Sequence, residues 1–287
     1  DQRLSRGLGD VYKRQTIHSQ KTKVYDLKMT IFHVFVLSLI QGATEFLPVS
    51  SSAHLVLYNK FVIGLKNDLS LDIAMHFGSL LAVILIVSKP LKEHMNKVLI
   101  KIGVNKSVFF LALATFPLVF MALFLEYARL LDLSRQVEII AFSNLIFALL
   151  LFVSDRKPSQ RKFSDITARD ILVIGIWQSF AAFPGTSRSG ASITGARFLN
   201  YGRKEAIIIS AVLSIPAIVI SSGYIGFKFL SSPNKIDIEF IIYATILSFI
   251  FSYLALKFFV KFGELFSFTP YVISVSYTHL RAHETIA

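Results

Sequence analysis

Two serine-rich segments contain the side chains of this 287-residue chain that are best suited to chemistry. The first covers residues 48–54 and reads PVSSSAH, and the second covers residues 184–190 and reads PGTSRSG. Each segment interrupts a strongly apolar stretch, where a polar backbone group is stable only if protein or a water-filled cavity satisfies its hydrogen bonds. The two segments therefore predict a polar site inside a membrane rather than two surface loops.

A carboxylate lies just before the first segment. Gln41 and Glu45 are four residues apart, so they share one face of a helix. A charged side chain inside a membrane is costly and indicates a functional site, with a cation or a metal ion as its expected partner. The alternative for Glu45 is a structural hydrogen bond to a neighbouring helix, and the amide of Gln41 also suits a contact between helices.

The serines of the first segment suit both a helix cap and a nucleophile. Ser50, Ser51 and Ser52 are typical N-cap residues, and a helix N-terminus offers free N–H groups to an anion. His54 follows Ser51 by three residues, within one helical turn, and a hydroxyl needs a neighbouring base to become a nucleophile. The alternative is that the serine caps the helix and the histidine packs in the core, but the nearby Glu45 favours catalysis.

The second segment adds a fixed cation. Gly185 permits close backbone approach, Thr186 and Ser187 can cap the next helix, and Arg188 has a planar fork that suits phosphate oxygens. A buried arginine needs a counter-charge, which either a phosphorylated ligand or Glu45 would provide. In both cases we expect Arg188 and Glu45 to face one cavity.

The composition indicates a membrane protein. The chain is 54% hydrophobic and contains 27 Phe, and several apolar runs approach the roughly 20 residues that cross a bilayer as a helix. The net charge of +12 comes from short basic segments between the apolar runs, which is typical of membrane-protein loops and argues against nucleic-acid binding. Because the chain has no cysteine, thiolate catalysis, disulfides and cysteine-bound metals are excluded.

The apolar runs divide into two similar halves. Each half begins with a shorter helix that stops at a proline, because the residue before proline disfavours the helical conformation. Gln and Phe are five apart in both broken helices, at Gln41 and Phe46 and at Gln178 and Phe183, although coincidence would also explain so short a repeat. Three spans per half would invert the second copy, so we predict an all-α polytopic membrane protein with an inverted repeat, about six transmembrane helices and two re-entrant helical hairpins. The expected broken helices are 31–47 and 171–183, and the expected spans are 71–88, 108–125, 137–153, 206–227, 238–259 and a truncated run from 265.

The ends of the chain differ from its middle. Residues 1–28 are polar and basic, and residues 276–287 form a polar tail. We expect both to be non-native additions to a membrane domain at 29–275, whose repeats lie at 29–154 and 169–275. Most Lys and Arg residues of the expected loops lie on one side of this arrangement, which is then cytoplasmic. The Ser51 segment would enter the membrane from outside and the Arg188 segment from inside.

The two motifs resemble those of undecaprenyl-diphosphate phosphatases of the BacA/UppP family. Residues 41–54, QGATEFLPVSSSAH, are similar to the family's Glu/Gln-x-x-x-Glu motif, and residues 184–190 to its Pro-Gly-x-Ser-Arg-Ser motif. The resemblance covers residues 29–275 and implies six spanning helices with two re-entrant hairpins. It also implies an enzyme of the bacterial inner membrane, open to the outer face, that removes the terminal phosphate of undecaprenyl diphosphate, recycles this lipid carrier for cell-wall synthesis and confers bacitracin resistance.

The resemblance also assigns roles to residues. Ser51 matches the proposed nucleophile, His54 the histidine that assists proton transfer, and Arg188 the arginine that binds the diphosphate. Glu45, which is also expected in the catalytic set, and Gln41 match the pair associated with a divalent cation, Mg²⁺ or Ca²⁺. The other polar positions of the two segments are expected to bind the polyprenyl diphosphate substrate: Ser50, Ser52, Gly185, Thr186, Ser187 and Ser189.

Two mechanisms and a second class of function stay open. Ser51 attacks phosphorus and forms a phosphoserine, or a metal-activated water attacks while Ser51 positions the phosphate. A secondary transporter or a lipid flippase also uses paired broken helices, but it would not require Ser51 and His54 together. Membrane lipids are expected partners in every case, and a homodimer is compatible with the pattern.

Overall fold

The structure is a computed structural model, and it describes residues 30–59, 62, 69–90, 104–130, 137–183, 185–230 and 238–273. Pro184 and the expected additions at 1–28 and 276–287 lie outside these ranges. Regular structure within the described ranges is helical, apart from one isolated bridge between Arg161 and Tyr201. The predicted all-α class is therefore confirmed.

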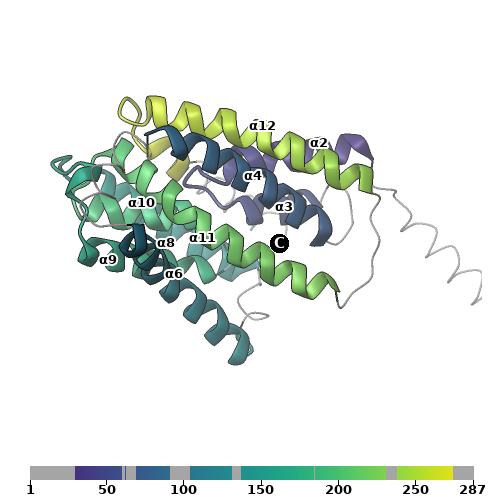
Figure 1. The fold of residues 1–287 in the computed structure, drawn as a ribbon, viewed down its shortest axis with the longest axis horizontal. Coiled ribbons are helices and arrows are strands. Elements are labelled where there is room, and N and C mark those ends of the chain that lie inside the picture. The colour runs from purple at the N-terminus through teal and green to yellow at the C-terminus, as the bar shows by residue number, and fades with distance from the viewer. Residues whose placement is uncertain are drawn as a thin grey trace, which may run out of the picture.

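The helices follow the predicted order along the chain (Figure 1). Both broken helices are present, and the first one ends at Thr44, earlier than the predicted residue 47. The helices of the first half are α2 (Ile31–Thr44), α3 (Ser51–Tyr58), α4 (Leu69–Pro90), α6 (Val104–Tyr127) and α8 (Val137–Asp155). Those that follow are η3 (Phe163–Asp165), α9 (Ala168–Ser179), η4 (Phe180–Ala182), α10 (Arg188–Phe198), α11 (Arg203–Leu230) and α12 (Ile238–Phe262).

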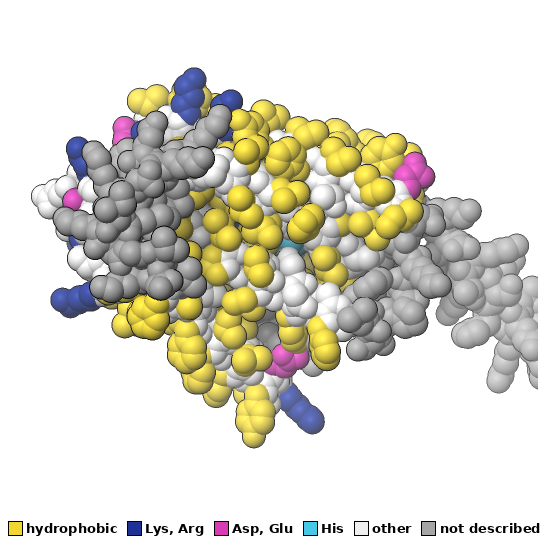
Figure 2. Space-filling model, viewed as in Figure 1, with side chains coloured by type: hydrophobic (Ala, Val, Ile, Leu, Met, Phe, Trp, Pro, Cys, Tyr) yellow, Lys and Arg dark blue, Asp and Glu magenta, His cyan; other side chains and the backbone are white. Residues whose placement is uncertain are grey.

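Four of the described helices are long and apolar enough to cross a membrane. Many of their large hydrophobic side chains are exposed, and hydrophobic side chains cover much of the face seen in Figure 2. An apolar surface of this extent indicates contact with lipid rather than water. The chain is therefore a helical membrane protein. The four spans are Leu69–Ser88, Phe109–Tyr127, Arg203–Phe227 and Ile238–Phe262, and Ile31–Thr44 and Phe142–Asp155 are shorter apolar helices.

Small residues allow α4 and α12 to pack closely. A Cβ atom on Gly78 would collide with the backbone oxygen of Thr245 in α12. Next to it, the hydroxyl of Ser79 lies 3.2 Å from that of Ser248 and accepts a hydrogen bond of 2.8 Å from Ser252. Small residues and hydroxyl bridges stabilise helix pairs in membranes because apolar burial contributes little there.

Each broken helix packs against a helix of the other half. In α2, a Cβ atom on Gly42 would lie 2.5 Å from the Cβ atom of Phe251 in α12. In α9, a Cβ atom on Gly175 would lie 2.5 Å from the carbonyl oxygen of Ala114 in α6. Glycine is therefore required at both contacts, and each half supports the broken helix of the other.

Polar anchors fix α9 and the neighbouring helix ends. The Asp170 carboxylate, near the start of α9, accepts hydrogen bonds from Arg161 at 2.6 and 2.9 Å and from the Tyr201 hydroxyl at 2.9 Å. A second carboxylate, Asp155 at the end of α8, accepts two from Arg203 at 2.6 and 2.9 Å. These bonds connect the start of α9 to Tyr201, which lies between α10 and α11, and the end of α8 to the start of α11.

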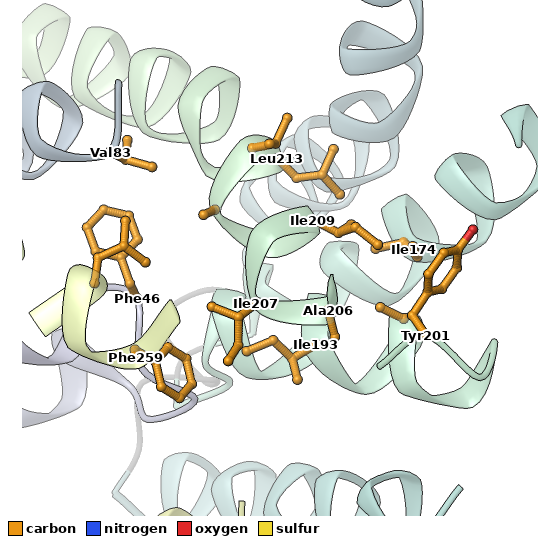
Figure 3. Packing of buried hydrophobic residues seen from close by; sticks show 14 of the residues in the cluster. Phe46, Val83, Ile174, Ile193, Tyr201, Ala206, Ile207, Ile209, Leu213 and Phe259 are labelled. Carbon is orange, nitrogen blue, oxygen red and sulfur yellow. The ribbon is translucent and has the colours of Figure 1, made fainter. Parts of the chain in front are cut away.

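A hydrophobic core connects the two halves behind these anchors (Figure 3). Phe46 follows α2, and it belongs to the same cluster as Val83 of α4 and Phe259 of α12. Ile193 of α10 and Ile207 of α11 belong to that cluster as well. The segment that follows α2 and helix α10 itself are thus held by one core.

Candidate active site

The first helix break places three polar groups at one point. Glu45 is the C-cap residue of α2. Ser50 is the N-cap of α3, and its hydroxyl accepts a hydrogen bond of 3.4 Å from the backbone N–H of Ala53. Ser51 is the first residue of α3. The predicted N-cap in 50–52 is confirmed at Ser50, which leaves the Ser51 side chain free for other contacts.

The second helix break has a similar cap and a strained turn. Ser187 is the N-cap of α10, and its hydroxyl accepts a hydrogen bond of 3.1 Å from the backbone N–H of Gly190. Gly185 has a φ of 93°, a conformation that favours glycine. A Cβ atom on Gly185 would also lie 2.5 Å from the carbonyl oxygen of Ile140 in α8. The predicted close approach at Gly185 is confirmed.

The two breaks contact each other directly. The Ser189 hydroxyl donates a hydrogen bond of 2.5 Å to the carbonyl oxygen of Leu47. Arg188 donates to the carbonyl oxygen of Glu45 at 3.4 Å and to that of Ser210 in α11 at 3.5 Å. These bonds connect the turn after α2 to the start of α10, and they connect Arg188 to α11.

The Glu45 carboxylate is the centre of the site. It is 8% exposed and forms an ion pair of 3.1 Å with Arg188. Its second oxygen accepts hydrogen bonds from Gln41 at 2.9 Å and from the Ser51 hydroxyl at 3.0 Å. The predicted common face of Gln41 and Glu45 and the predicted meeting of Arg188 with Glu45 are both confirmed.

A cavity of about 450 Å³ opens beside this cluster. Its polar end includes Glu45, Ser51 and Arg188, together with Ser50, Ser52, Thr186 and Ser187. Its other walls are largely apolar and come from α6 and α11. The cavity therefore combines a charged end with an apolar passage. Predicted substrate-binding residues that line it are Ser50, Ser52, Thr186 and Ser187; Gly185 and Ser189 lie in the same turn but contact protein.

The histidines differ from the sequence prediction. The Nδ1 atom of His54 lies 2.7 Å from the carbonyl oxygen of Ser50, and because a carbonyl only accepts, Nδ1 donates. His54 is not among the residues that line the cavity, and the hydroxyl of Ser51 donates to Glu45 instead. The histidine that does line the cavity is His76 of α4, whose Nδ1 donates to the Asp72 carbonyl oxygen at 2.7 Å.

His76 was missed because it lies inside an expected span, away from both motifs. The sequence does contain an indication of its role, because an ionisable residue within an apolar membrane helix by itself suggests a functional site. The Nδ1 bond leaves the Nε2 atom of His76 as the nitrogen that can bind or release a proton. His76 also interacts electrostatically with Glu45. We therefore add His76 to the candidate site.

Two buried oxygen atoms of the site have no hydrogen-bond partner among the described residues: Gln41 Oε1 and Thr186 Oγ1. Buried polar atoms are nearly always paired, so both atoms fit contacts to a bound ligand or ion. The part of the chain that the structure describes contains no group of three His, Asp or Glu side chains that could hold a metal.

These features define an integral membrane protein in which two broken helices meet at a buried, charged site. The family within that class follows from comparison with known proteins. The family model described as Bacitracin resistance protein BacA matches residues 34–278, and the chain belongs to this family.

Relatives of similar length support the assignment. The chain is 37% identical over 253 residues to a protein of Jannaschia sp. and 36% identical over 252 residues to one of Dinoroseobacter shibae. It is 38% identical over 251 residues to a protein of Saccharophagus degradans. Each match covers 85% of the chain and 94% of the relative, and each relative is named undecaprenyl-diphosphatase.

Proposed function

We propose that this chain is a membrane phosphatase that hydrolyses undecaprenyl diphosphate to undecaprenyl phosphate and inorganic phosphate. Its relatives carry this activity in their names, and the family is associated with bacitracin resistance. The reaction recycles the lipid carrier for cell-wall synthesis. One observation carries the proposal. Ser51 at the start of α3 and Arg188 at the start of α10 both bind Glu45, in a cavity with an apolar wall.

The polar end of the cavity suits a diphosphate. The guanidinium of Arg188 can bind two phosphate oxygens at once, and the N-termini of α3 and α10 add positive potential. The unpartnered hydroxyl of Thr186 is a further donor for a phosphate oxygen. On binding, the phosphate replaces part of the Arg188 contact to Glu45, which frees the carboxylate for chemistry.

Ser51 is the proposed nucleophile. Its hydroxyl donates to Glu45 at 3.0 Å, so the carboxylate can take the proton as the oxygen bonds to the terminal phosphorus. The bond between that phosphorus and the bridging oxygen breaks, and undecaprenyl phosphate leaves with the electron pair. Water then cleaves the phosphoserine, releases phosphate and restores Ser51. Direct attack by water, with Ser51 positioning the phosphate, is the alternative.

A divalent cation, Mg²⁺ or Ca²⁺, is part of the proposal, with Glu45 and Gln41 as its protein ligands. The carboxylate and the unpartnered amide oxygen of Gln41 fit such a role, because Mg²⁺ is often bound by one or two carboxylates together with substrate phosphates. When bound, the cation would neutralise charge on the phosphate oxygens. Arg188 makes the same contribution from the opposite hairpin.

The two histidines have different proposed roles. His54 orients the serine turn through its bond to the Ser50 carbonyl oxygen, and proton transfer by His54 stays a prediction. His76 lines the cavity, and since its Nδ1 donates to Asp72, its Nε2 is the nitrogen that could contact a phosphate oxygen. His76 thus complements Arg188 in binding the substrate.

The inverted repeat and six spans are also proposed. Support comes from the reciprocal packing of α2 on α12 and α9 on α6, and from the small residues that make these contacts. Small residues also occupy matching sequence positions around the two glutamines. Ser38 and Gly42 flank Gln41 at the same separations along the chain at which Gly175 and Ser179 flank Gln178. In a bacterial inner membrane, the loop charges would place the cavity mouth at the outer side.

Phosphate release from undecaprenyl diphosphate by the detergent-solubilised chain tests the function. We expect release that needs Mg²⁺ or Ca²⁺, stops with a chelator and is lost in Ser51→Ala. Circular dichroism and gel filtration establish that the variant is folded. A folded chain that releases no phosphate would contradict the proposal. Movement of lipid across vesicles that survives Ser51→Ala would favour a transporter or a flippase.

A further inference from the structure

The cavity continues from the charged end into a passage between α6 and α11. Leu118 and Ala122 of α6 and Ala217 and Ile220 of α11 line it. Other side chains of the same helix segments face outward, and Phe120 is 60% exposed. The passage is thus formed by two helices whose outer faces contact lipid.

A hydrogen bond joins the two walls at the far end of this passage. The hydroxyl of Tyr224 in α11 donates to the carboxylate of Glu126 in the last turn of α6. Both residues line the same cavity as Ser51 and Arg188. The Glu126–Tyr224 bond therefore connects the walls at the opposite end from the charged site.

Each wall also contains a proline near the charged end. Pro117 lies in α6 and Pro216 in α11. A proline inside a helix lacks the N–H of the usual hydrogen bond, so the helix bends more easily there. The segments from each proline to the joining bond are about 14 Å and about 12 Å long at the helical rise of 1.5 Å per residue. The two prolines therefore lie at similar distances from the Glu126–Tyr224 bond.

We propose that this passage holds the first isoprene units of the polyprenyl chain, and that the Glu126–Tyr224 bond closes it until the lipid enters sideways from the membrane. The inference rests on the proposed function, because a diphosphate bound at Arg188 would carry its chain along the largely apolar walls that α6 and α11 form. The outer parts of α6 and α11 separate about Pro117 and Pro216, and the bond between Glu126 and Tyr224 breaks and reforms.

A reversible cross-link tests this inference. The chain has no native cysteine, so Glu126→Cys with Tyr224→Cys gives one unique pair. Because side chains as long as Glu and Tyr separate their backbones too far for a direct disulfide, a bifunctional methanethiosulfonate reagent bridges the pair. We expect the bridge to lower hydrolysis of undecaprenyl diphosphate at least tenfold, while geranyl diphosphate, which is short and water-soluble, is hydrolysed within about twofold of the uncross-linked rate. Reduction should restore the lipid activity.

The matched control bridges two positions on one helix. Phe120→Cys with Phe124→Cys receives the same reagent on the exposed face of α6 without joining α6 to α11, and should keep its lipid activity. Unchanged lipid hydrolysis in the bridged Glu126 and Tyr224 pair would overturn the inference, as would an equal loss for both substrates. If the untreated chain hydrolyses neither diphosphate, the proposed function itself has failed.

Tyr224→Phe gives a second test without a reagent. The variant keeps the ring and removes the hydroxyl that donates to Glu126. We expect kcat/KM for the lipid substrate to rise by about threefold, consistent with loss of one hydrogen bond, and kcat/KM for geranyl diphosphate to stay the same. A fall for the lipid substrate would mean that the bond supports binding rather than closing the passage, and would contradict the inference.

Discussion

The two helical hairpins, α2 with α3 and α9 with α10, have similar caps where their second helices begin, but very different surroundings. The whole stretch from Ser189 to Arg197 in α10 is buried. In α3, only Leu55 is buried and Val56 is exposed. The second hairpin carries the fixed cation Arg188 in this buried frame, whereas the first carries the proposed nucleophile Ser51 on a short, lightly packed helix. The charge of Arg188 and the proposed nucleophile Ser51 thus come from hairpins that differ in how deeply they are buried.

Anchoring accounts for much of this difference. The second hairpin starts from Thr167, which caps α9, and from Asp170, which binds Arg161 and Tyr201. The cap of α2 is Thr30, which pairs with His33 at an exposed site. An exposed cap contributes about 1 kcal/mol, while a buried carboxylate with several donors contributes more. Variants at the anchor of the second hairpin should therefore act on folding, whereas variants at the charged end of the cavity should act on function.

The largest effect is expected at Arg188. Arg188→Ala removes the cation that binds the phosphates and leaves Glu45 without its ion pair, so kcat/KM for phosphate release should fall by about 10³-fold. Arg188→Lys keeps the positive charge but loses the planar guanidinium. Its kcat/KM should therefore lie between those of the native chain and Arg188→Ala. Steady-state phosphate release measures both. Full activity in Arg188→Ala would show that the second hairpin contributes no catalytic charge.

The next effect concerns the anchor of the second hairpin. Asp170→Asn should lower the unfolding free energy by about 3 kcal/mol, because it leaves buried donors and a cation unpaired. The folded enzyme should keep its kcat, since Asp170 does not line the cavity. Thermal unfolding and phosphate release together measure this. A variant of normal stability but reduced kcat would reverse the roles that we assign.

Acid should produce the same weakening in the native chain. Burial raises the pKa of Asp170, but hydrogen bonds from Arg161 and Thr167 outweigh this and hold the pKa at about 2, below the ordinary 3.8. A lowered carboxyl pKa stabilises the fold above pH 3.8 and loses this effect as the pH falls toward 2. Unfolding curves over this range should therefore show a smaller acid effect in Asp170→Asn than in the native chain.

The histidines give a finer comparison within the site. His54→Ala removes the bond to the Ser50 carbonyl oxygen and should lower kcat by about 10²-fold, since Ser51 loses its orientation. His76→Ala should raise KM more than it lowers kcat, with a change of about tenfold. Rates over a range of substrate concentrations separate the two. A larger loss of kcat in His76→Ala than in His54→Ala would assign His76 to the chemical step rather than to substrate binding.

The smallest effects concern the packing of the two hairpins. Gly42→Ala and Gly175→Ala each place a Cβ atom 2.5 Å from an atom of the opposite half. Each variant should lose about 1–3 kcal/mol of stability through overpacking. Thermal unfolding in detergent measures both, and Gly226→Ala, whose Cβ atom would meet nothing within 4 Å, is the control. If the two packing variants were as stable as the control, the close contacts of α2 with α12 and of α9 with α6 would be contradicted.

Local chemistry allowed much of the site to be predicted from sequence. Serine preferences gave caps in the right segments, the spacing of Gln41 and Glu45 gave their common face, and the charge of Arg188 required a partner. The apolar runs also predicted the helices, because length and hydropathy are properties of single segments. These features depend on a few neighbouring residues.

Contacts between distant segments could not be predicted in the same way. Hydropathy does not reveal that α6 and α11 line one cavity, that His76 faces it while His54 turns to its own helix, or that Asp170 binds Tyr201. Each of these facts depends on helix rotation and on which helices pair. A pattern within one segment does not fix either property.

A double-mutant cycle on Ser51 and Arg188 tests most directly whether the two hairpins form one active site. The measurement is kcat/KM for phosphate release from undecaprenyl diphosphate by the native chain, Ser51→Ala, Arg188→Ala and the double variant. If both side chains act on the same phosphoryl group, the double variant should be about as inactive as the worse single variant. Losses that multiply would mean that the two residues act independently, and would contradict a joint site.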